Sequence, residues 1–233
     1  MSGQLPLSLR WPSWLRLEHF DPHGASQGTP AALAAAAADA GAPWVFLSGP
    51  RGSGKTHLLV AACHAALAQA RRAQYVGLSE PGAPRGERLR ALGGGDLLAL
   101  DDLQALAGDG AAEHALFDLY NRCRAEGTVM LFAAQAVPAA LPLQLPDLRS
   151  RLAACTQGLL KPLDEAGRRR ILRERAAARG IELDDGVMDW LFTRQARDLA
   201  TLVDLLDRID RAALAAQRRV TIPFLRQLLA EPA

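Results

Sequence analysis

The chain has 233 residues, of which 49% are hydrophobic and 22% charged, and a formal net charge of +2 at pH 7. Its length and composition suit a globular protein of one or two domains, and its nearly balanced charge excludes the strongly basic footprint of a dedicated nucleic-acid binder. No apolar stretch is long enough to span a membrane, no secretory signal begins the chain, and three scattered cysteines argue against a disulfide framework, so we expect a cytoplasmic protein with no membrane contact.

Residues 1–28 lack sustained periodicity and are interrupted by prolines and glycines, which favours an extended arm. The pair Thr29-Pro30 then indicates the start of a helix, with Thr29 as the N-cap and Pro30 in the first turn. Gly41 is expected to follow the end of that helix.

A phosphate-binding loop comes next, between a strand predicted at 43–48 and a helix predicted to run to about Ala70. Its residues fit the spacing G-x-x-x-x-G-K-[ST] and are Gly49, Pro50, Arg51, Gly52, Ser53, Gly54, Lys55 and Thr56. Glycines let successive N–H groups point at phosphate oxygens, and the helix N-terminus adds a favourable dipole. Lys55 would reach the terminal phosphates and Thr56 would ligate Mg²⁺. We predict ADP or ATP as the cofactor, because the N-K-x-D segment that reads guanine is missing.

The remaining pattern alternates strands with helices and then becomes helical. Strands are expected at 74–78, 97–102 and 128–133, and helices at 87–92, 111–126 and from Asp147, as the N-cap, to Arg151. This alternation predicts an α/β domain with a parallel sheet flanked by helices. Four helical patterns follow a boundary near Pro162, at 164–179, 184–194, 197–217 and 222–230, and they predict a small all-helical second domain.

Acidic and polar residues end the third and fourth strands of the predicted sheet. Asp101 follows four apolar residues, and we predict that it holds Mg²⁺ together with Thr56. Asp102 could activate an attacking water, or the two aspartates could simply end a strand. Gln135 ends the next strand, where it could touch the γ-phosphate or merely leave the sheet as a polar residue.

Four stretches together resemble the AAA+ ATPases of the DnaA type, and most closely the Hda family of DnaA-homologous regulators. They are Gly54-Lys55-Thr56-His57-Leu58-Leu59, Leu116-Phe117-Asp118-Leu119-Tyr120-Asn121-Arg122, Leu145-Pro146-Asp147-Leu148-Arg149-Ser150-Arg151-Leu152 and Thr221-Ile222-Pro223-Phe224. The resemblance implies an AAA+ nucleotide-binding core at 24–162 and a helical lid at 163–233.

The resemblance also implies roles for single residues. Arg151 would be an arginine finger that reaches a neighbour's nucleotide in trans, and Arg197 would be the sensor arginine of the lid. His57 would join the nucleotide site, with Gln135 at the position of the first sensor. Leu17 and Phe20 match the apolar stretch that approaches adenine.

The arm at 1–23 carries a peptide, Gln4-Leu5-Pro6-Leu7-Ser8-Leu9, that resembles the Q-L-x-L-x-L segment with which the family binds the sliding clamp. In an extended peptide, Gln4 can hydrogen-bond a polar pocket while Leu5, Leu7 and Leu9 fill an apolar groove. A tail containing a few leucines is the plainer interpretation of the same residues.

The function implied by the resemblance is negative regulation of DNA replication initiation. An ADP-bound protein would bind the β sliding clamp of DNA polymerase III, contact DNA indirectly through the clamp, and stimulate hydrolysis of the ATP bound to the DnaA initiator. It would hydrolyse its own nucleotide weakly or not at all and would be nucleoid-associated during replication. Whether it forms homo-oligomers is left undecided by the sequence. The alternatives are a DnaC-like helicase loader that binds single-stranded DNA and a small-molecule P-loop kinase.

A dense basic run in the second domain has two interpretations. Its members are Arg168, Arg169, Arg170, Arg173 and Arg175. On a helix these arginines spread over more than one face, so they form either a solvated surface or a contact with DNA near the clamp.

Overall fold

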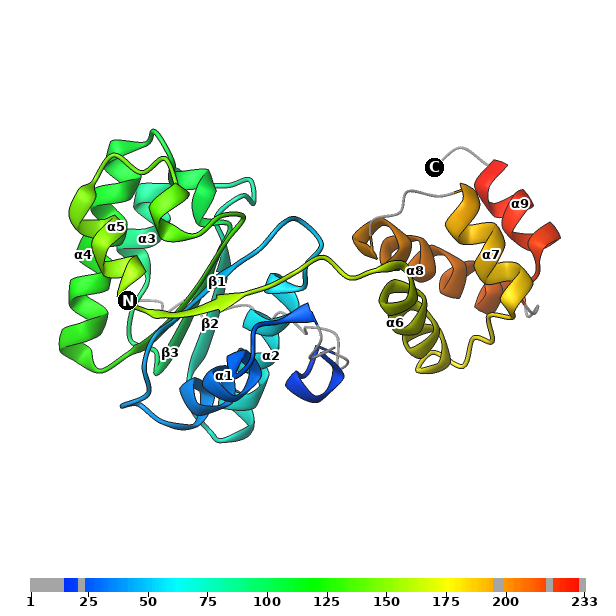
Figure 1. Cartoon of the computed structure of the whole chain (residues 1–233), viewed down its shortest axis with the longest axis horizontal. Helices are drawn as coiled ribbons and strands as arrows, with labels where there is room; N and C mark the ends of the chain where they lie inside the picture. The colour runs from blue at the N-terminus through cyan, green and yellow to red at the C-terminus, as the bar shows by residue number, and fades with distance from the viewer. Residues whose placement is uncertain (1–14, 21–23, 195–198, 217–219, 231–233) are drawn as a thin grey trace, which may run out of the picture. The chain divides into compact units, whose positions relative to one another are not determined.

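The computed structural model describes residues 15–20, 24–194, 199–216 and 220–230 (Figure 1). The chain divides into two units, residues 1–162 and residues 163–233. The first unit contains a five-stranded sheet with helices on both faces, and the second contains helices α6 to α9. Within these described ranges, no helix has the length and apolar character needed to cross a membrane.

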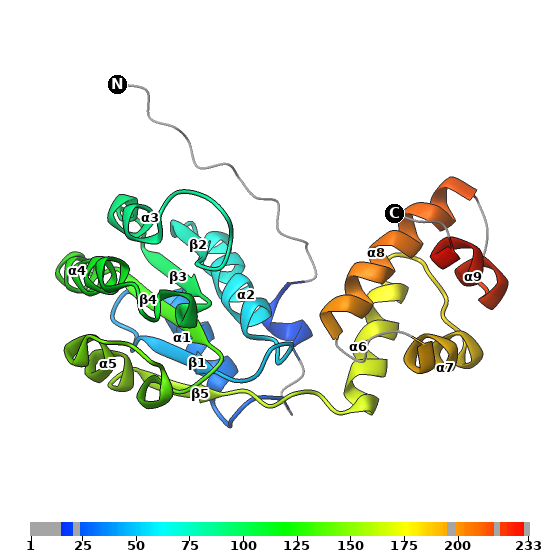
Figure 2. The same cartoon turned by 90° about the horizontal axis from the view of Figure 1, so that it is seen from above.

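The sheet of the first unit is parallel throughout, which confirms the predicted α/β fold. Its strands are β1 (Val45–Ser48), β2 (Ala73–Gly77), β3 (Leu97–Asp101), β4 (Val129–Ala134) and β5 (Thr156–Leu159). They lie in the order β2-β3-β4-β1-β5, as Figure 2 shows. Ser48 pairs with Ala134 and Gly77 pairs with Asp101, so the carboxyl ends of the strands share one edge of the sheet.

Two apolar layers enclose the sheet, because successive side chains of a strand point to opposite faces. Helices α1 (Thr29–Ala38) and α2 (Lys55–Ala68) cover Val45 and Leu47 on one face. Helices α3 (Arg85–Ala91), α4 (Gly110–Glu126) and α5 (Pro146–Ala153) cover Phe46 and Phe132 on the other (Figure 2). Burial on both faces explains why β1, β3 and β4 are continuous apolar runs.

Two predicted helix caps are wrong. The N-cap of α1 is Gly28, whose φ of 86° lies in the left-handed region, and the Thr29 hydroxyl pairs with the Ser26 hydroxyl at 2.8 Å instead of capping the helix. The N-cap of α5 is Leu145, and Asp147 lies inside the first turn. In both cases the cap lies before the proline-containing first turn, and no side chain supplies it.

Strand β5 has no counterpart among the elements that the sequence pattern predicts. Three of its four residues are exposed, because β5 is an edge strand that buries only Gly158. A Cβ at Gly158 would lie 2.8 Å from Leu47 Cδ2 and 2.9 Å from Thr29 Cγ2, so α1 packs directly against this backbone. Just after β5, Leu160 forms an isolated antiparallel bridge with Ala25.

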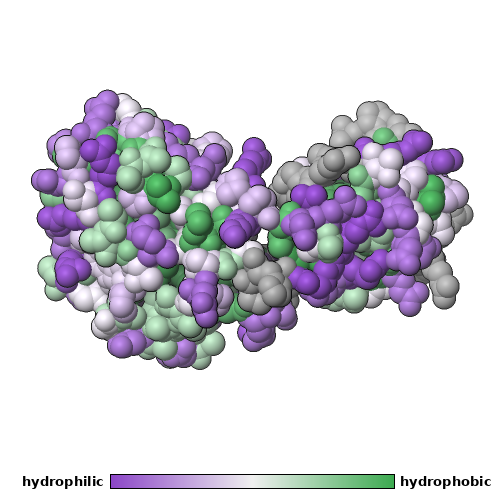
Figure 3. All heavy atoms as spheres, viewed as in Figure 1, coloured by the Kyte–Doolittle hydropathy of each residue, from purple (hydrophilic) through white to green (hydrophobic). Residues whose placement is uncertain are grey.

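The second unit has its own apolar core, formed by α6 (Glu165–Ala177), α7 (Asp185–Arg194), α8 (Leu199–Ala216) and α9 (Ile222–Ala230). These helices correspond to the four predicted helical patterns. Hydrophilic side chains cover most of the surface over α6 in Figure 3.

Candidate functional site

The loop between β1 and α2 has the geometry of a phosphate cradle. Gly49 follows β1, and a Cβ there would lie 2.5 Å from the Leu160 carbonyl oxygen and 2.8 Å from Ser53 Oγ, so only glycine fits. The Ser53 hydroxyl is buried and has no hydrogen-bond partner among the described residues. Gly52 and Gly54 have φ values of 77° and 92°, which turn the backbone back toward the helix. A buried orphan donor in a loop of this shape fits an anionic ligand.

Lys55, the first residue of α2, turns back over this loop. Its Nζ donates to the carbonyl oxygens of Gly49 (2.8 Å) and Pro50 (2.9 Å), and only 6% of the residue is exposed. Burial lowers the pKa of Lys55, while the charges of Asp101 and Asp102 act in the opposite direction. A buried ammonium held only by backbone carbonyls is suited to bind phosphate oxygens.

Thr56 and Asp101, the two residues predicted to hold Mg²⁺, are in direct contact. Thr56 Oγ1 donates to Asp101 Oδ2 at 2.5 Å, and the Tyr75 hydroxyl donates to the same oxygen at 3.1 Å. Asp101 is 2% exposed, and burial raises the pKa of its carboxyl group, opposed by the hydrogen bond from Thr56. No cluster of three or more metal-ligating side chains occurs in the described part of the chain, so this pair could hold Mg²⁺ only together with phosphate and water oxygens.

A side chain that the sequence pattern does not single out joins Asp102 to Gln135. Gln104 Nε2 donates to Asp102 Oδ1 (2.7 Å), and Gln104 Oε1 accepts from the Gln135 backbone N–H (3.1 Å). Asp102 has a φ of 59° and is therefore in the left-handed region. Tyr75 and Gln104 are missed by sequence reasoning because their contacts depend on the alignment of β2, β3 and β4.

Residues 16–20 lie against the beginning of α2. The short turn η1 (Leu17–His19) belongs to this segment, and Leu17 and Phe20 pack against the apolar layer of α1 and α2. The His57 ring contacts the Arg16 carbonyl oxygen at 2.9 Å and lies edge-on to the Phe20 ring at 5.8 Å. A Cβ on Gly54 would lie 2.8 Å from Phe20 Cε2, so the Phe20 ring borders the loop itself.

Arg151 lies on α5, and three side chains of α4 hold it. Its guanidinium carbon lies 4.4 Å from the centre of the Phe117 ring and 5.3 Å from the centre of the Tyr120 ring. Its Nη1 donates to Asn121 Oδ1. The side chain is half-buried, and its charge lies in the last turn of α5, where the helix dipole favours a cation.

Arg151 and the phosphate-binding loop occupy opposite ends of β1. The Tyr120 ring contacts the Trp44 ring with centroids 4.5 Å apart, and Trp44 immediately precedes β1. The Thr156 N–H donates to the Trp44 carbonyl oxygen, which confirms that the chain just after Arg151 meets the amino end of β1. The loop follows the carboxyl end of the same strand, so Arg151 has no access to its own loop across the sheet.

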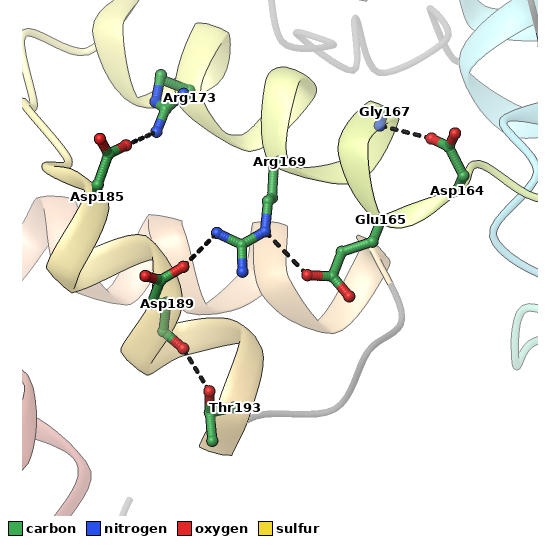
Figure 4. Close-up of polar contacts among 8 residues, drawn as sticks. All are labelled: Asp164, Glu165, Gly167, Arg169, Arg173, Asp185, Asp189 and Thr193. Atoms are coloured by element: carbon green, nitrogen blue, oxygen red, sulfur yellow. Dashed lines mark hydrogen bonds and ion pairs between the residues drawn. The ribbon is translucent and has the colours of Figure 1, made fainter.

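Three arginines of the basic run in the second unit, Arg169, Arg170 and Arg173, form ion pairs. Figure 4 shows Arg169 between Glu165 of the same helix (3.0 Å) and Asp189 of α7 (2.7 Å). Arg173 pairs with Asp185 at 2.6 Å. These contacts tie α6 to α7 and favour a structural role for the two arginines over a contact with DNA.

Some predicted site residues lie outside the described ranges. They are Gln4, Leu5, Leu7 and Leu9 of the clamp-like peptide, and Arg197 of the lid.

The sequence and the fold of this chain were compared with those of known proteins. A family model described as the lid domain of Hda matches residues 164–229. A Haemophilus influenzae protein described as uncharacterized is 42% identical over 188 residues, which are 80% of this chain and 81% of that protein. Domain III of the Thermotoga maritima replication initiation protein DnaA has a TM-score of 0.70 at 23% identity, covering 94% of this chain and 97% of that one. The replication initiator DnaA bound to AMPPCP and single-stranded DNA has a TM-score of 0.66 at 21% identity, covering 89% of this chain and 69% of that one.

Proposed function

The chain belongs to the Hda-like family of DnaA-homologous proteins, and we propose that it is a clamp-tethered regulator that stimulates hydrolysis of the ATP held by the DnaA initiator. In this role the chain binds a nucleotide in its own loop and supplies Arg151 to the nucleotide of its partner. The result is a DnaA molecule in its ADP form, which limits re-initiation of replication.

The separation of Arg151 from the loop is the observation that carries this proposal. An arginine finger stabilises charge that develops on a transferring phosphoryl group, and it acts only within contact distance. Arg151 lies at the amino end of β1 and Lys55 follows the carboxyl end. A finger in that position would act on the nucleotide of another molecule. Its contacts with Phe117 and Asn121 orient the guanidinium.

Nucleotide binding is assigned to the loop Gly49 to Thr56, with support from its orphan Ser53 hydroxyl and from the AMPPCP bound to the similar initiator. Thr56 and Asp101 would hold Mg²⁺, which neutralises phosphate charge when bound. Phe20 borders the loop at Gly54, Leu17 packs against the same apolar layer, and His57 lies edge-on to Phe20. We assign all three residues to the nucleotide's surroundings.

Weak turnover of the chain's own nucleotide is part of the proposal. Its own loop lacks access to Arg151, and the Asp102 carboxylate accepts a hydrogen bond from Gln104. The bound nucleotide, which we propose to be ADP, therefore serves mainly to order the loop and the adjoining residues.

The test is a single-turnover assay of ATP preloaded on DnaA. We expect hydrolysis to accelerate only when the chain, the β clamp and DNA carrying the clamp are all present. Omission of each component in turn is the control. An unchanged rate with all three components would contradict the proposal.

A helicase-loader role in binding single-stranded DNA is the second candidate, because the similar initiator structure holds such DNA. The pairing of Arg169 and Arg173 with acidic residues weighs against it, since DNA phosphates would have to compete with Asp189 and Asp185 for these cations. Stimulation that requires single-stranded DNA and is independent of the clamp would favour this second candidate.

A further inference from the structure

Glu113 is a buried carboxylate that the proposed function does not use. It lies in the first turn of α4 and is 0% exposed. Its Oε2 accepts from the backbone N–H groups of Gln144 (2.8 Å) and Leu145 (2.9 Å), whereas its Oε1 has no hydrogen-bond partner within the described residues. A charged side chain in the interior calls for a physical reason, because burial without compensation is costly.

The compensation comes from the beginnings of two helices. Glu113 lies in the first turn of α4, where the helix dipole favours a negative charge, and Asp109 caps that helix through the Ala112 N–H at 3.0 Å. The two N–H groups that Glu113 accepts from, those of Gln144 and Leu145, immediately precede α5. The first residue of α5, Pro146, has no N–H of its own. The carboxylate therefore joins the amino ends of α4 and α5.

The same face of α4 holds both ends of α5. Glu113 binds the residues at its beginning, while Phe117, Tyr120 and Asn121 contact Arg151 in its last turn. These positions of α4 follow helical i, i+4, i+7 spacing and so share one side. Because α5 has only eight residues, a shift at its first turn would move the guanidinium at its end.

We propose that Glu113 is a positioning residue that fixes α5 and, through it, the direction of Arg151. The proposal rests on the function proposed above, because the effect on catalysis requires Arg151 to act on a partner's nucleotide. Glu113 itself touches no substrate.

Two substitutions separate the reach of this side chain from its charge. Glu113→Asp keeps the carboxylate but shortens the side chain by one methylene, so that the oxygen no longer reaches both N–H groups. Glu113→Gln keeps the reach and an accepting oxygen but removes the charge. Nucleotide binding with full stoichiometry shows that each variant is folded.

The first readout is amide hydrogen exchange at Gln144 and Leu145, measured without any partner. We expect Glu113→Asp to speed exchange at both amides by about tenfold or more, while Glu113→Gln stays within about threefold of the parent. Unchanged protection of both amides in Glu113→Asp would show that the Glu113 carboxylate does not hold the beginning of α5 to α4.

The second readout is stimulation of DnaA-bound ATP hydrolysis. Displacement of a catalytic group by about 1 Å can cost about 10²-fold in rate, so we expect the maximal rate with Glu113→Asp to fall by about 10- to 100-fold. The DnaA concentration that gives half the maximal rate should stay unchanged, and Glu113→Gln should restore most of the activity. A Glu113→Asp variant that loses amide protection yet stimulates fully would overturn the positioning role.

The two readouts distinguish failure of the proposed function from failure of the link between α4 and α5. If the parent protein gives no stimulation, the proposed function fails and the positioning role fails with it. The exchange result then still decides whether Glu113 ties α4 to α5, because it is measured on the chain alone.

Discussion

At the scale of single residues, Asp101 is a buried carboxylate whose environment has a consequence for stability. It is 2% exposed and accepts hydrogen bonds from Thr56, Tyr75 and the Asp102 N–H. Burial still prevails and raises the pKa of its carboxyl group, and the charge of Asp102 acts in the same direction. An ionised Asp101 therefore costs stability in the nucleotide-free protein, as expected of a residue placed for a cation.

This cost predicts a pH dependence of stability. Because the pKa of Asp101 is higher in the folded than in the unfolded chain, the folded state binds more protons as the pH rises through the ordinary carboxyl range, and stability falls. Asp101→Asn removes this titration, and its amide can donate to Thr56 and Tyr75 while its oxygen accepts from Asp102. We expect the melting temperature of Asp101→Asn to exceed that of the parent at pH 7, and the difference to shrink toward pH 4.

Asp118→Asn is the matched control for that measurement. It makes the same chemical change at an exposed carboxylate of α4, away from Asp101. Thermal unfolding of parent and variants without nucleotide or Mg²⁺ gives the comparison. A gap between Asp101→Asn and the parent that is the same at pH 4 and pH 7 would show that titration of Asp101 is not its cause.

The site residues differ in how far the sequence can predict them. The loop Gly49 to Thr56 and the acidic end of β3 follow from local patterns, because each lies within a few residues of a strand. Tyr75 and Gln104 could not be predicted, since their partners lie on other strands and depend on register. Glu113 follows no pattern either, because its partners lie on the segment before α5.

At the scale of elements, buried strands and amphipathic helices were predictable and exposed or capped segments were not. Strands β1, β3 and β4 are continuous apolar runs between two helical layers. Strand β5 escapes prediction because it is exposed and polar and is held by pairing with β1. The caps of α1 and α5 are fixed by the backbone at Gly28 and Leu145, which residue preferences at Thr29 and Asp147 do not indicate.

The connection between α6 and α7 gives a prediction at this scale. Arg169 pairs with Glu165 inside α6 and with Asp189 of α7 (Figure 4). Its guanidinium carbon also lies 4.7 Å from the centre of the Phe192 ring. Exposed ion pairs contribute about 0.2–1 kcal/mol, so Asp189→Asn should speed amide exchange in α7 by about 1.4- to 5-fold. Added salt should reduce the difference, because it screens the pair in the parent.

Glu165→Gln is the control, because it removes the other partner of the same arginine. That pair lies within α6, so exchange in α7 should stay at the parental rate. Equal acceleration by Glu165→Gln and Asp189→Asn would mean that the α6–α7 pair contributes nothing specific to α7.

At the scale of the whole molecule, the proposed function assigns three tasks to different parts of the chain. In that proposal the loop after β1 binds a nucleotide, Arg151 acts on a second molecule, and the arm attaches the chain to the clamp. If the tasks are independent, each can be removed without loss of the others.

Removal of residues 1–9 tests this independence. We expect the shortened chain to lose binding to the β clamp, because Gln4, Leu5, Leu7 and Leu9 are gone, and to keep its affinity for nucleotide. Surface-bound clamp measures the first property, and a fluorescent ADP analogue measures the second. Full clamp binding by the shortened chain would remove these four residues from the clamp contact.

Single-turnover hydrolysis of DnaA-bound ATP with Arg151→Ala on clamp-loaded DNA is the direct test of whether Arg151 acts in trans. We expect stimulation to fall by about 10³-fold or more, as when an arginine finger is removed, while nucleotide and clamp binding persist. Arg149→Ala, a change on the same helix α5, should stimulate like the parent. Undiminished stimulation by Arg151→Ala, or an equal loss with Arg149→Ala, would rule out Arg151 as the finger.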